Sequence, residues 1–523
     1  MTASSTPAAA VNSSKLSRRA LPWIAGAVVL AAVAGLIVSN ALWPYRYRNV
    51  EPLLENVLAS KIKIDHYRRT YFPHPGFVAT GLTLRRNSTP DVPPFGTAEE
   101  LHVQGEWNDF LLLHRSVPLV YIKGLHIVIP PVGSRANHED FPPGSSMDFA
   151  GPTTPVEVLH LRDAEFDVQR TNGGQYNYPI HDLVVKNLQR GNAVLYALDM
   201  GNALPTGHIL SHGSFGPLKP QALGDTPLSG EFTFSNVALK DTGGISGVLS
   251  SYGSFHGTIA SIAAGITTTV PDFAVGRGRP VALGGWVRGS VNGLNGDVTL
   301  QDIVLKTGAT TVEAQGRVVA LKKDEPKTTD IDLVVKGGRA EDVLRPFIHG
   351  NVPILGAASL HGHAHVEPAQ KGRRFLERLS MNGTFEVPAE RLTDRKTENT
   401  LSAFSERAQR GGDKTAEADV FSSLSGPVTI RDGVASSERL RFALPGADTD
   451  LNGTFDLHTG TVHFVGDLRM QSDISHVTTG WKSFLLKPLI PFFRGKKAGA
   501  VIPIAITGSP GAYKVGQNLM HKK

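Results

Sequence analysis

Alternation of apolar and polar residues limits the folds open to this chain more than any other feature. The stretch LNGTFDLHTGTVHFVGDLRM, residues 451–470, shows this alternation on both sides of a central His-Thr-Gly turn. A period of two places apolar side chains on one face of a β-strand and polar side chains on the other. The segment therefore predicts a hairpin with one apolar face and one wetted face.

The same alternation of apolar and polar residues occurs in most of the chain from residue 62 onward. It is interrupted by segments rich in proline, glycine and serine. Several segments place a glycine before an apolar-x-apolar alternation. They begin at residues 228, 360, 379 and 451, with a looser copy at 314. Their spacing is not fixed, which argues against a regular solenoid or propeller. We therefore expect a mainly β protein with long antiparallel sheets, irregular repetition and a few short helices.

Composition excludes several classes of function. The chain has 523 residues and no cysteine, so disulfides, thiolate catalysis and cysteine-based zinc or iron–sulfur sites are ruled out. Its formal net charge is +6 at pH 7, a small excess for this length. No dense block of Lys and Arg interleaves with aromatic residues, so we do not expect nucleic acid as a partner.

A long apolar run near the N-terminus predicts a membrane anchor. Residues 21–43, LPWIAGAVVLAAVAGLIVSNALW, contain only Ser39 and Asn40 as polar residues. Such a run suffices to cross roughly 30 Å of hydrocarbon. Its final Ser-Asn-Ala also resembles a signal-peptidase site, but the run is long for a signal peptide, so we expect an uncleaved transmembrane helix. Basic residues within 15–19 predict that residues 1–20 are a cytoplasmic tail and that the bulk lies outside the cytoplasm.

The rest of the chain divides into three regions. Residues 44–150 form an N-terminal β region that begins with an amphipathic helix at 50–60, whose apolar stripe we expect to lie on the first part of the sheet. A turn-rich segment near 131–155 separates it from a central β-repeat region, 151–395. Residues 396–523 form a C-terminal domain.

The sequence carries no recognisable catalytic motif. It lacks a P-loop, a Gly-x-Ser-x-Gly elbow, a His-Glu-x-x-His helix and a dinucleotide-binding glycine fingerprint. Three histidines, His361, His363 and His365, alternate along one predicted strand and so point the same way. Three histidines can hold a metal ion, but a wetted strand face that happens to use histidine explains them as well, and we favour it. We expect no enzyme activity, no metal site and no cofactor.

The order of motifs resembles that of AsmA-like proteins. FPHPGFVATGLTLRR at 72–86, followed by ELHVQGEWNDFLLLHRSVPLVYIKGLHIVIPP at 100–131, resembles the start of that family. The segment 421–470, with its Arg-Asp-Gly and Gly-Thr-Phe-Asp-Leu landmarks, and IPIAITGSPGAYKV at 502–515 resemble the AsmA C-terminal domain. The regions that contain these segments, 44–150 and 396–523, make up about half of the chain.

The resemblance implies a location and a function. Members of the family are implied to be periplasmic proteins anchored in the inner membrane, with a long curled β-sheet whose inner face is apolar. They are similar to TamB and to chorein-type bridge-like lipid transporters, and are linked to phospholipid traffic and outer-membrane assembly. The resemblance implies that the sheet is elongated, curled and groove-like. We therefore expect a single-pass inner-membrane protein that carries phospholipid along an apolar β-groove and supports outer-membrane biogenesis, with other envelope proteins as further partners.

Two alternatives stay open. The protein can instead be a non-transporting envelope scaffold that assists outer-membrane protein assembly, and its apolar face can be a closed core rather than a groove. If a groove exists, the apolar sides of the predicted strands line it. The candidate groove residues are Phe77, Leu82, Leu84, Phe455, Leu457, Val462, Phe464, Leu468 and Met470.

Overall fold

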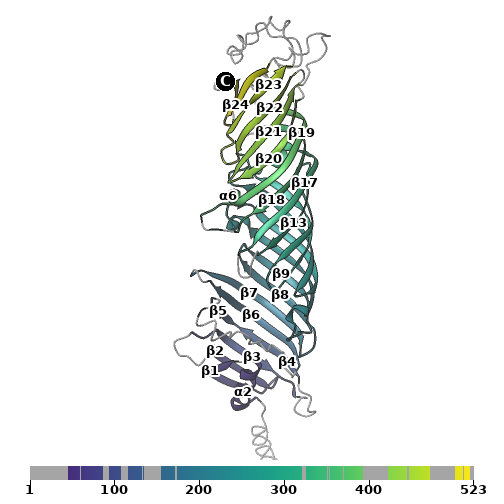
Figure 1. The fold of residues 1–523 in the computed structure, drawn as a ribbon. Helices are drawn as coiled ribbons and strands as arrows, with labels where there is room; N and C mark the ends of the chain where they lie inside the picture. Colours follow the sequence, from purple (N-terminus) through teal and green to yellow (C-terminus); the bar gives the residue numbers. More distant parts are fainter. Residues whose placement is uncertain are drawn as a thin grey trace, which may run out of the picture.

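The computed structural model shows one very large β-sheet. Twenty-five strands are hydrogen-bonded into it in the described part of the chain, and the helices are short. Figure 1 shows an elongated body with β1 to β3 at one end and β22 to β24 at the other. The predicted mainly β fold is therefore confirmed. The structure describes residues 45–58, 60–85, 93–107, 116–131, 134, 155–170, 173–320, 326–349, 352, 354–368, 370, 372–392, 422–444, 447–470, 501–510 and 512–518.

A helix and five strands form the first end of the body. They are α2 (Tyr47–Leu58), β1 (Lys61–Thr70), β2 (Gly76–Arg85), β3 (Gly96–Gln104), β4 (Val117–Lys123) and β5 (His126–Ile129). The predicted anchor at 21–43 and the tail at 1–20 lie outside the described residues. Among the helices that the structure does describe, none has the length and apolar character needed to cross a membrane.

The middle of the body contains long strands and short helical connections. They are β6 (Val156–Gln169), β7 (Gln175–Leu188), β8 (Val194–Ala203), β9 (Thr206–Phe215), η1 (Leu223–Asp225), β10 (Pro227–Ala238), η2 (Leu239–Thr242), β11 (Ile245–Ser246), β12 (Val248–Thr258), β13 (Ser261–Val275), β14 (Val281–Val291), β15 (Val298–Thr307), β16 (Thr310–Val319), β17 (Thr328–Arg339), α5 (Ala340–Leu344), β18 (Ile354–Val366), α6 (Phe375–Arg378) and β19 (Leu379–Leu392). The strands from β8 to β17 cross one another in Figure 1, as expected of one sheet that curls on itself.

Six strands complete the far end. They are β20 (Ser422–Arg431), β21 (Val434–Leu444), β22 (Ala447–Asp456), β23 (Val462–Met470), β24 (Val501–Gly508) and β25 (Lys514–Gln517). The sheet is mixed rather than purely antiparallel, because β4 and β5 both run parallel to β6. The expectation of an antiparallel sheet was therefore wrong at this point. A parallel neighbour needs a long connection, and the segment between β5 and β6 is long enough to supply it.

One face of the sheet can be followed from end to end through the strand register. Residues that pair across a β-ladder project from the same face. Such pairs connect β2 to β23 through every intervening strand, for example Ile180 with Met200, Phe385 with Leu360, and Phe464 with Gly453. We call the face that carries Phe77 on β2 and Phe464 on β23 the inner face, and the opposite one the outer face.

Local bulges keep apolar side chains on the inner face where the alternation changes phase. In β2, Phe77 and Ala79 are buried before Gly81, and Leu82 and Leu84 are buried after it. Gly81 has a φ of 67°, in the left-handed region that favours glycine. The one-residue shift turns the following side chains back to the inner face, as a β-bulge does.

The repeated glycine motif explains how the sheet curls. Its glycines lie on the inner face, where neighbouring strands approach too closely for a side chain. A Cβ at Gly316 would lie 2.2 Å from the carbonyl oxygen of Asp330, and one at Gly383 would lie 2.5 Å from that of His361. Glycine kinks of this kind let a sheet bend strongly toward one face.

This account predicts a clear difference between two glycine substitutions. Gly316→Ala should destabilise the protein by roughly 1–3 kcal/mol, because the added methyl group must push β17 away from β16. Gly265→Ala is the matched control, because Gly265 lies on the outer face of β13 with no atom within 4 Å of its Cβ position. The midpoint of urea unfolding, followed by circular dichroism, should fall only for Gly316→Ala. Equal midpoints for both variants would contradict the proposed role of the inner-face glycines.

Candidate functional site

The central part of the inner face is mostly apolar, and few of its described side chains belong to a compact hydrophobic cluster. Four compact hydrophobic clusters exist among the described residues, and from β9 to β16 only the end of β13 contributes to any of them. Val237, Val270 and Ile303 on this stretch are buried, and most of its other apolar side chains are half-buried. The half-buried side chains include Ile209, Phe232, Phe234, Phe255, Ile266, Val287, Leu300, Leu305 and Val312.

Aromatic rings and glycines alternate across neighbouring strands of this central face. Phe232 on β10 faces Gly253 on β12, while Gly230 faces Phe255. The rings of Phe232 and Phe255 lie 6.4 Å apart, in a tilted arrangement. Each ring is thus paired across the ladder with a position that has no side chain.

Polar residues occupy the outer face of the same strands. Glu231 and Thr233 flank Phe232 along β10, and Ser254 precedes Phe255 along β12; all three are exposed. The inner face of these two strands is therefore the more apolar one, although Tyr252 is exposed on the outer face of β12. A slender apolar ligand gains by binding the inner face, because each CH₂ group that it removes from water contributes about 0.8 kcal/mol.

The N-terminal end of the inner face is closed by α2. Val50 of this helix is buried in a cluster with Phe77, Leu82 and Leu84, three of the predicted groove residues. The ring of Tyr67 stacks on that of Phe77 at 5.2 Å, and its hydroxyl donates to the carbonyl oxygen of Tyr45 at 2.7 Å. Burial raises the pKa of the Tyr67 hydroxyl. These predicted groove residues thus form a packed core beneath the helix.

The other predicted groove residues lie at the far end of the sheet. Phe455, Val462 and Phe464 are half-buried on the inner face of β22 and β23, and Leu468 is buried in a cluster that extends from β18 to β24. Met470 ends β23, where it pairs with Ala447; its side chain lies outside the described part. The strand register thus places both groups of predicted residues on one continuous face, although they lie at opposite ends of the body.

Leu457 follows the end of β22 and belongs to a different structure, a seam between two margins of the sheet. It is buried with Leu376 of α6 and with Val275 at the end of β13. Backbone bonds reinforce the contact: Phe375 N–H donates to the carbonyl oxygen of Gly243 at 2.9 Å, and Val275 N–H to that of Pro346 at 2.8 Å. The seam connects the ends of strands β10 through β13 with two turns, the one between β18 and β19 and the one between β22 and β23. The curled sheet therefore closes on itself there.

The half-buried residues of β9 to β16 were missed by the sequence-based list. The signal that could have found them is present in the sequence, because residues 228–234 carry the same glycine-then-alternation motif as residues 451–457. The alternation of apolar and polar residues shows which side chains of a strand lie on its apolar face. It does not show which stretches of that face are covered by a helix or by the seam.

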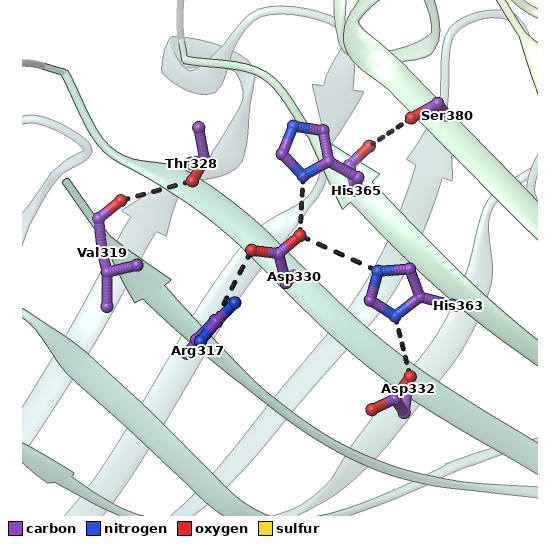
Figure 2. Close-up of polar contacts among 8 residues, drawn as sticks. All are labelled: Arg317, Val319, Thr328, Asp330, Asp332, His363, His365 and Ser380. Carbon is purple, nitrogen blue, oxygen red and sulfur yellow. Dashed lines mark hydrogen bonds and ion pairs between the residues drawn. The ribbon is translucent and has the colours of Figure 1, made fainter. Parts of the chain in front are cut away.

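The three histidines of β18 lie on the outer face and pair with the neighbouring strand. His365 Nδ1 lies 2.7 Å from Asp330 Oδ1, and His363 Nδ1 lies 2.8 Å from Asp332 Oδ1 (Figure 2). Arg317 approaches Asp330 from the other side, at 3.6 Å. His361 instead faces Val334. Each histidine thus meets the residue opposite it, and the described residues contain no group of three or more side chains suited to a metal ion.

Similar histidine–carboxylate pairs recur along the outer face near the other end of the body. His160 Nε2 lies 2.6 Å from Asp182, His208 Nε2 lies 2.7 Å from Asp199, and His126 Nε2 lies 2.9 Å from Asp167. These contacts join side chains across neighbouring strands. Pairs of this kind support the pairing of the strands that carry them.

The Asp330 contacts predict a dependence of stability on pH. The hydrogen bond from His365 holds the pKa of Asp330 below its usual range. A carboxylate whose pKa is depressed in the folded state stabilises the protein above its unfolded pKa, and this stabilisation is lost as pH falls through the folded value. Asp330→Asn should therefore flatten the fall in stability below about pH 4, by less than about 1 kcal/mol for a partly exposed pair.

Urea midpoints measured at a series of acidic pH values would check this. His365→Gln should flatten the profile in the same direction, because it removes the hydrogen bond that contributes most to the lowered pKa of Asp330. His361→Gln serves as the control, since His361 faces Val334, and should leave the profile unchanged. A wild-type profile that stays parallel to that of Asp330→Asn would show that this pair contributes nothing.

Comparison with known proteins adds no assignment. No protein-family model matches the sequence, and no curated protein does either.

Proposed function

We propose that this protein is anchored in the inner membrane and carries phospholipid along the inner face of its sheet, in support of outer-membrane biogenesis. The observation that carries the proposal is the apolar, half-buried stretch of that face from β9 to β16. An apolar face that is not packed in a compact core is a candidate binding site for an apolar ligand. The resemblance of the motif order to that of AsmA-like proteins supports the same function.

Transport of phospholipid along the sheet requires binding but no covalent reaction. Acyl chains lie against the inner face while headgroups stay in water at its margin, and movement needs only a continuous apolar lining. The body of the protein lies outside the cytoplasm in this proposal, held by residues 21–43. Its partners are phospholipid, the inner membrane and other envelope proteins, and no residue acts as a catalyst.

A second candidate function, an envelope scaffold, is favoured by one observation on the outer face. Leu210, Tyr252 and Trp286 lie in one lateral row across β9, β12 and β14, connected through paired threonines. Tyr252 is 62% exposed and Trp286 40%. Exposed aromatic residues of this kind are typical of protein interfaces. A scaffold would use this row and would leave the inner face without lipid.

Photo-crosslinking within the full chain distinguishes the two functions. A photoreactive amino acid at Phe255 should form an adduct with phospholipid in cell membranes, because this side chain projects from the inner face. The matched control is the adjacent position, Ser254, which projects from the outer face and should give no lipid adduct. Mass spectrometry of the irradiated protein identifies the adduct. Equal lipid labelling at both positions, or none at Phe255, would reject lipid transport along the inner face.

A charge should have different effects in the open and the packed parts of the inner face. Phe232→Asp should leave the protein folded, because the half-buried carboxylate still reaches water, yet it should abolish lipid adducts at Phe255. Leu451→Asp should unfold the C-terminal strands, since Leu451 is only 2% exposed and a buried unpaired charge costs roughly 3–5 kcal/mol. Circular dichroism and crosslinking on the same samples provide both readouts. Unfolding by Phe232→Asp would favour a closed core.

A further inference from the structure

We propose that three exposed aromatic side chains at the N-terminal end, Tyr71, Phe72 and Trp107, seat the body on the surface of the bilayer. We call them the aromatic patch. Phe72 is 89% exposed, the largest exposed fraction of any large hydrophobic side chain in the described part, and Tyr71 and Trp107 are 48% and 45% exposed. The inference rests on the membrane anchor of the proposed function and goes beyond it by assigning a second membrane contact.

Backbone and side-chain contacts hold the patch together. Phe72 lies in the turn between β1 and β2, while Trp107 follows β3. The indole N–H of Trp107 donates to the carbonyl oxygen of Pro73 at 3.2 Å. The backbone N–H of Gly105 donates to the carbonyl oxygen of Pro75 at 2.7 Å. The end of β3 is thus tied to the β1–β2 turn, and the aromatic side chains lie on one fixed surface.

The patch lies where the chain enters the body. The hydroxyl of Tyr45 would lie 2.2 Å from a Cβ at Gly105, so the Tyr45 ring packs directly against the base of the patch. Tyr45 comes two residues after the apolar run at 21–43. Two residues span at most about 7 Å. A membrane that holds the run therefore lies within reach of the patch.

The chemistry of the patch fits the interface of a lipid bilayer. Tyr and Trp favour the headgroup region, where an apolar ring and a polar atom are both satisfied. Phe72 has no polar atom, so it gains most by entering the acyl region. Arg48 and Arg68, both exposed near this end, add positive charge that favours anionic lipid. Contact between the aromatic patch and the bilayer would hold β1 to β3, where the inner face begins, at the level of the lipid headgroups.

The absence of cysteine from the chain permits a direct test with single labels. The full-length Phe72→Cys variant, labelled with an environment-sensitive fluorophore, is reconstituted into vesicles of phosphatidylethanolamine and phosphatidylglycerol. We expect its emission to shift to shorter wavelength and to be largely quenched by nitroxide groups on the acyl chains. Ser254→Cys, exposed in the middle of the outer face, is the matched control and should show neither effect.

The outcomes separate failure of the patch from failure of the anchor. Vesicle flotation reports whether the chain is anchored at all; a protein that does not float contradicts the anchor and the inference together. A protein that floats but whose Phe72 label stays as exposed as the Ser254 label overturns the inference alone. A blue-shifted Phe72 label that acyl-chain nitroxides do not quench would assign the patch to a protein partner and would also overturn it.

Discussion

The alternation of side chains in a β-strand is the constraint on which the rest of this structure depends. Applied to strand after strand in one sheet, it produces two faces of opposite polarity, and the apolar face must be packed against something or left for a ligand. The protein packs it at both ends and at one seam. Between them, from β9 to β16, few of the described inner-face side chains belong to a compact cluster, and most are half-buried. The inner-face glycines bend the sheet toward this side, so its apolar residues face one another rather than bulk water.

The architecture also spreads stability along the length of the body. Nearly every strand pairs with its neighbours in sequence, as in repeat proteins whose units contact only adjacent units. Outer-face contacts such as that between His365 and Asp330 add cross-strand support without using the inner face. This separation of roles lets the inner face stay apolar and half-buried while the outer face provides polar contacts and solubility. The seam of α6 is the exception, because it joins strands distant in sequence.

Much of the fold could be predicted from the sequence, because alternation is a local property. The pattern in 451–470 predicted the hairpin formed by β22 and β23, and the apolar spacing at 50–60 predicted a helix where α2 lies. The expected contact of this helix with the first part of the sheet is confirmed, because Val50 of α2 is buried with Phe77. Other non-local features were out of reach, and nothing in the sequence around Phe232 shows that no helix covers it. Leu457 belongs to the seam only because α6, some eighty residues earlier, packs against it. The parallel pairing of β4 and β5 with β6 likewise depends on the path of a connection that has no distinctive pattern.

The central claim is that the inner face binds acyl chains. The most direct measurement is a mass-spectrometric lipid inventory of the body, residues 45–523, purified without detergent. The account predicts that phospholipid copurifies in stoichiometric amount or above, and that substitution of the central aromatic residues by aspartate removes it. A folded body that carries no lipid under these conditions would contradict the account and leave the inner face as a structural core.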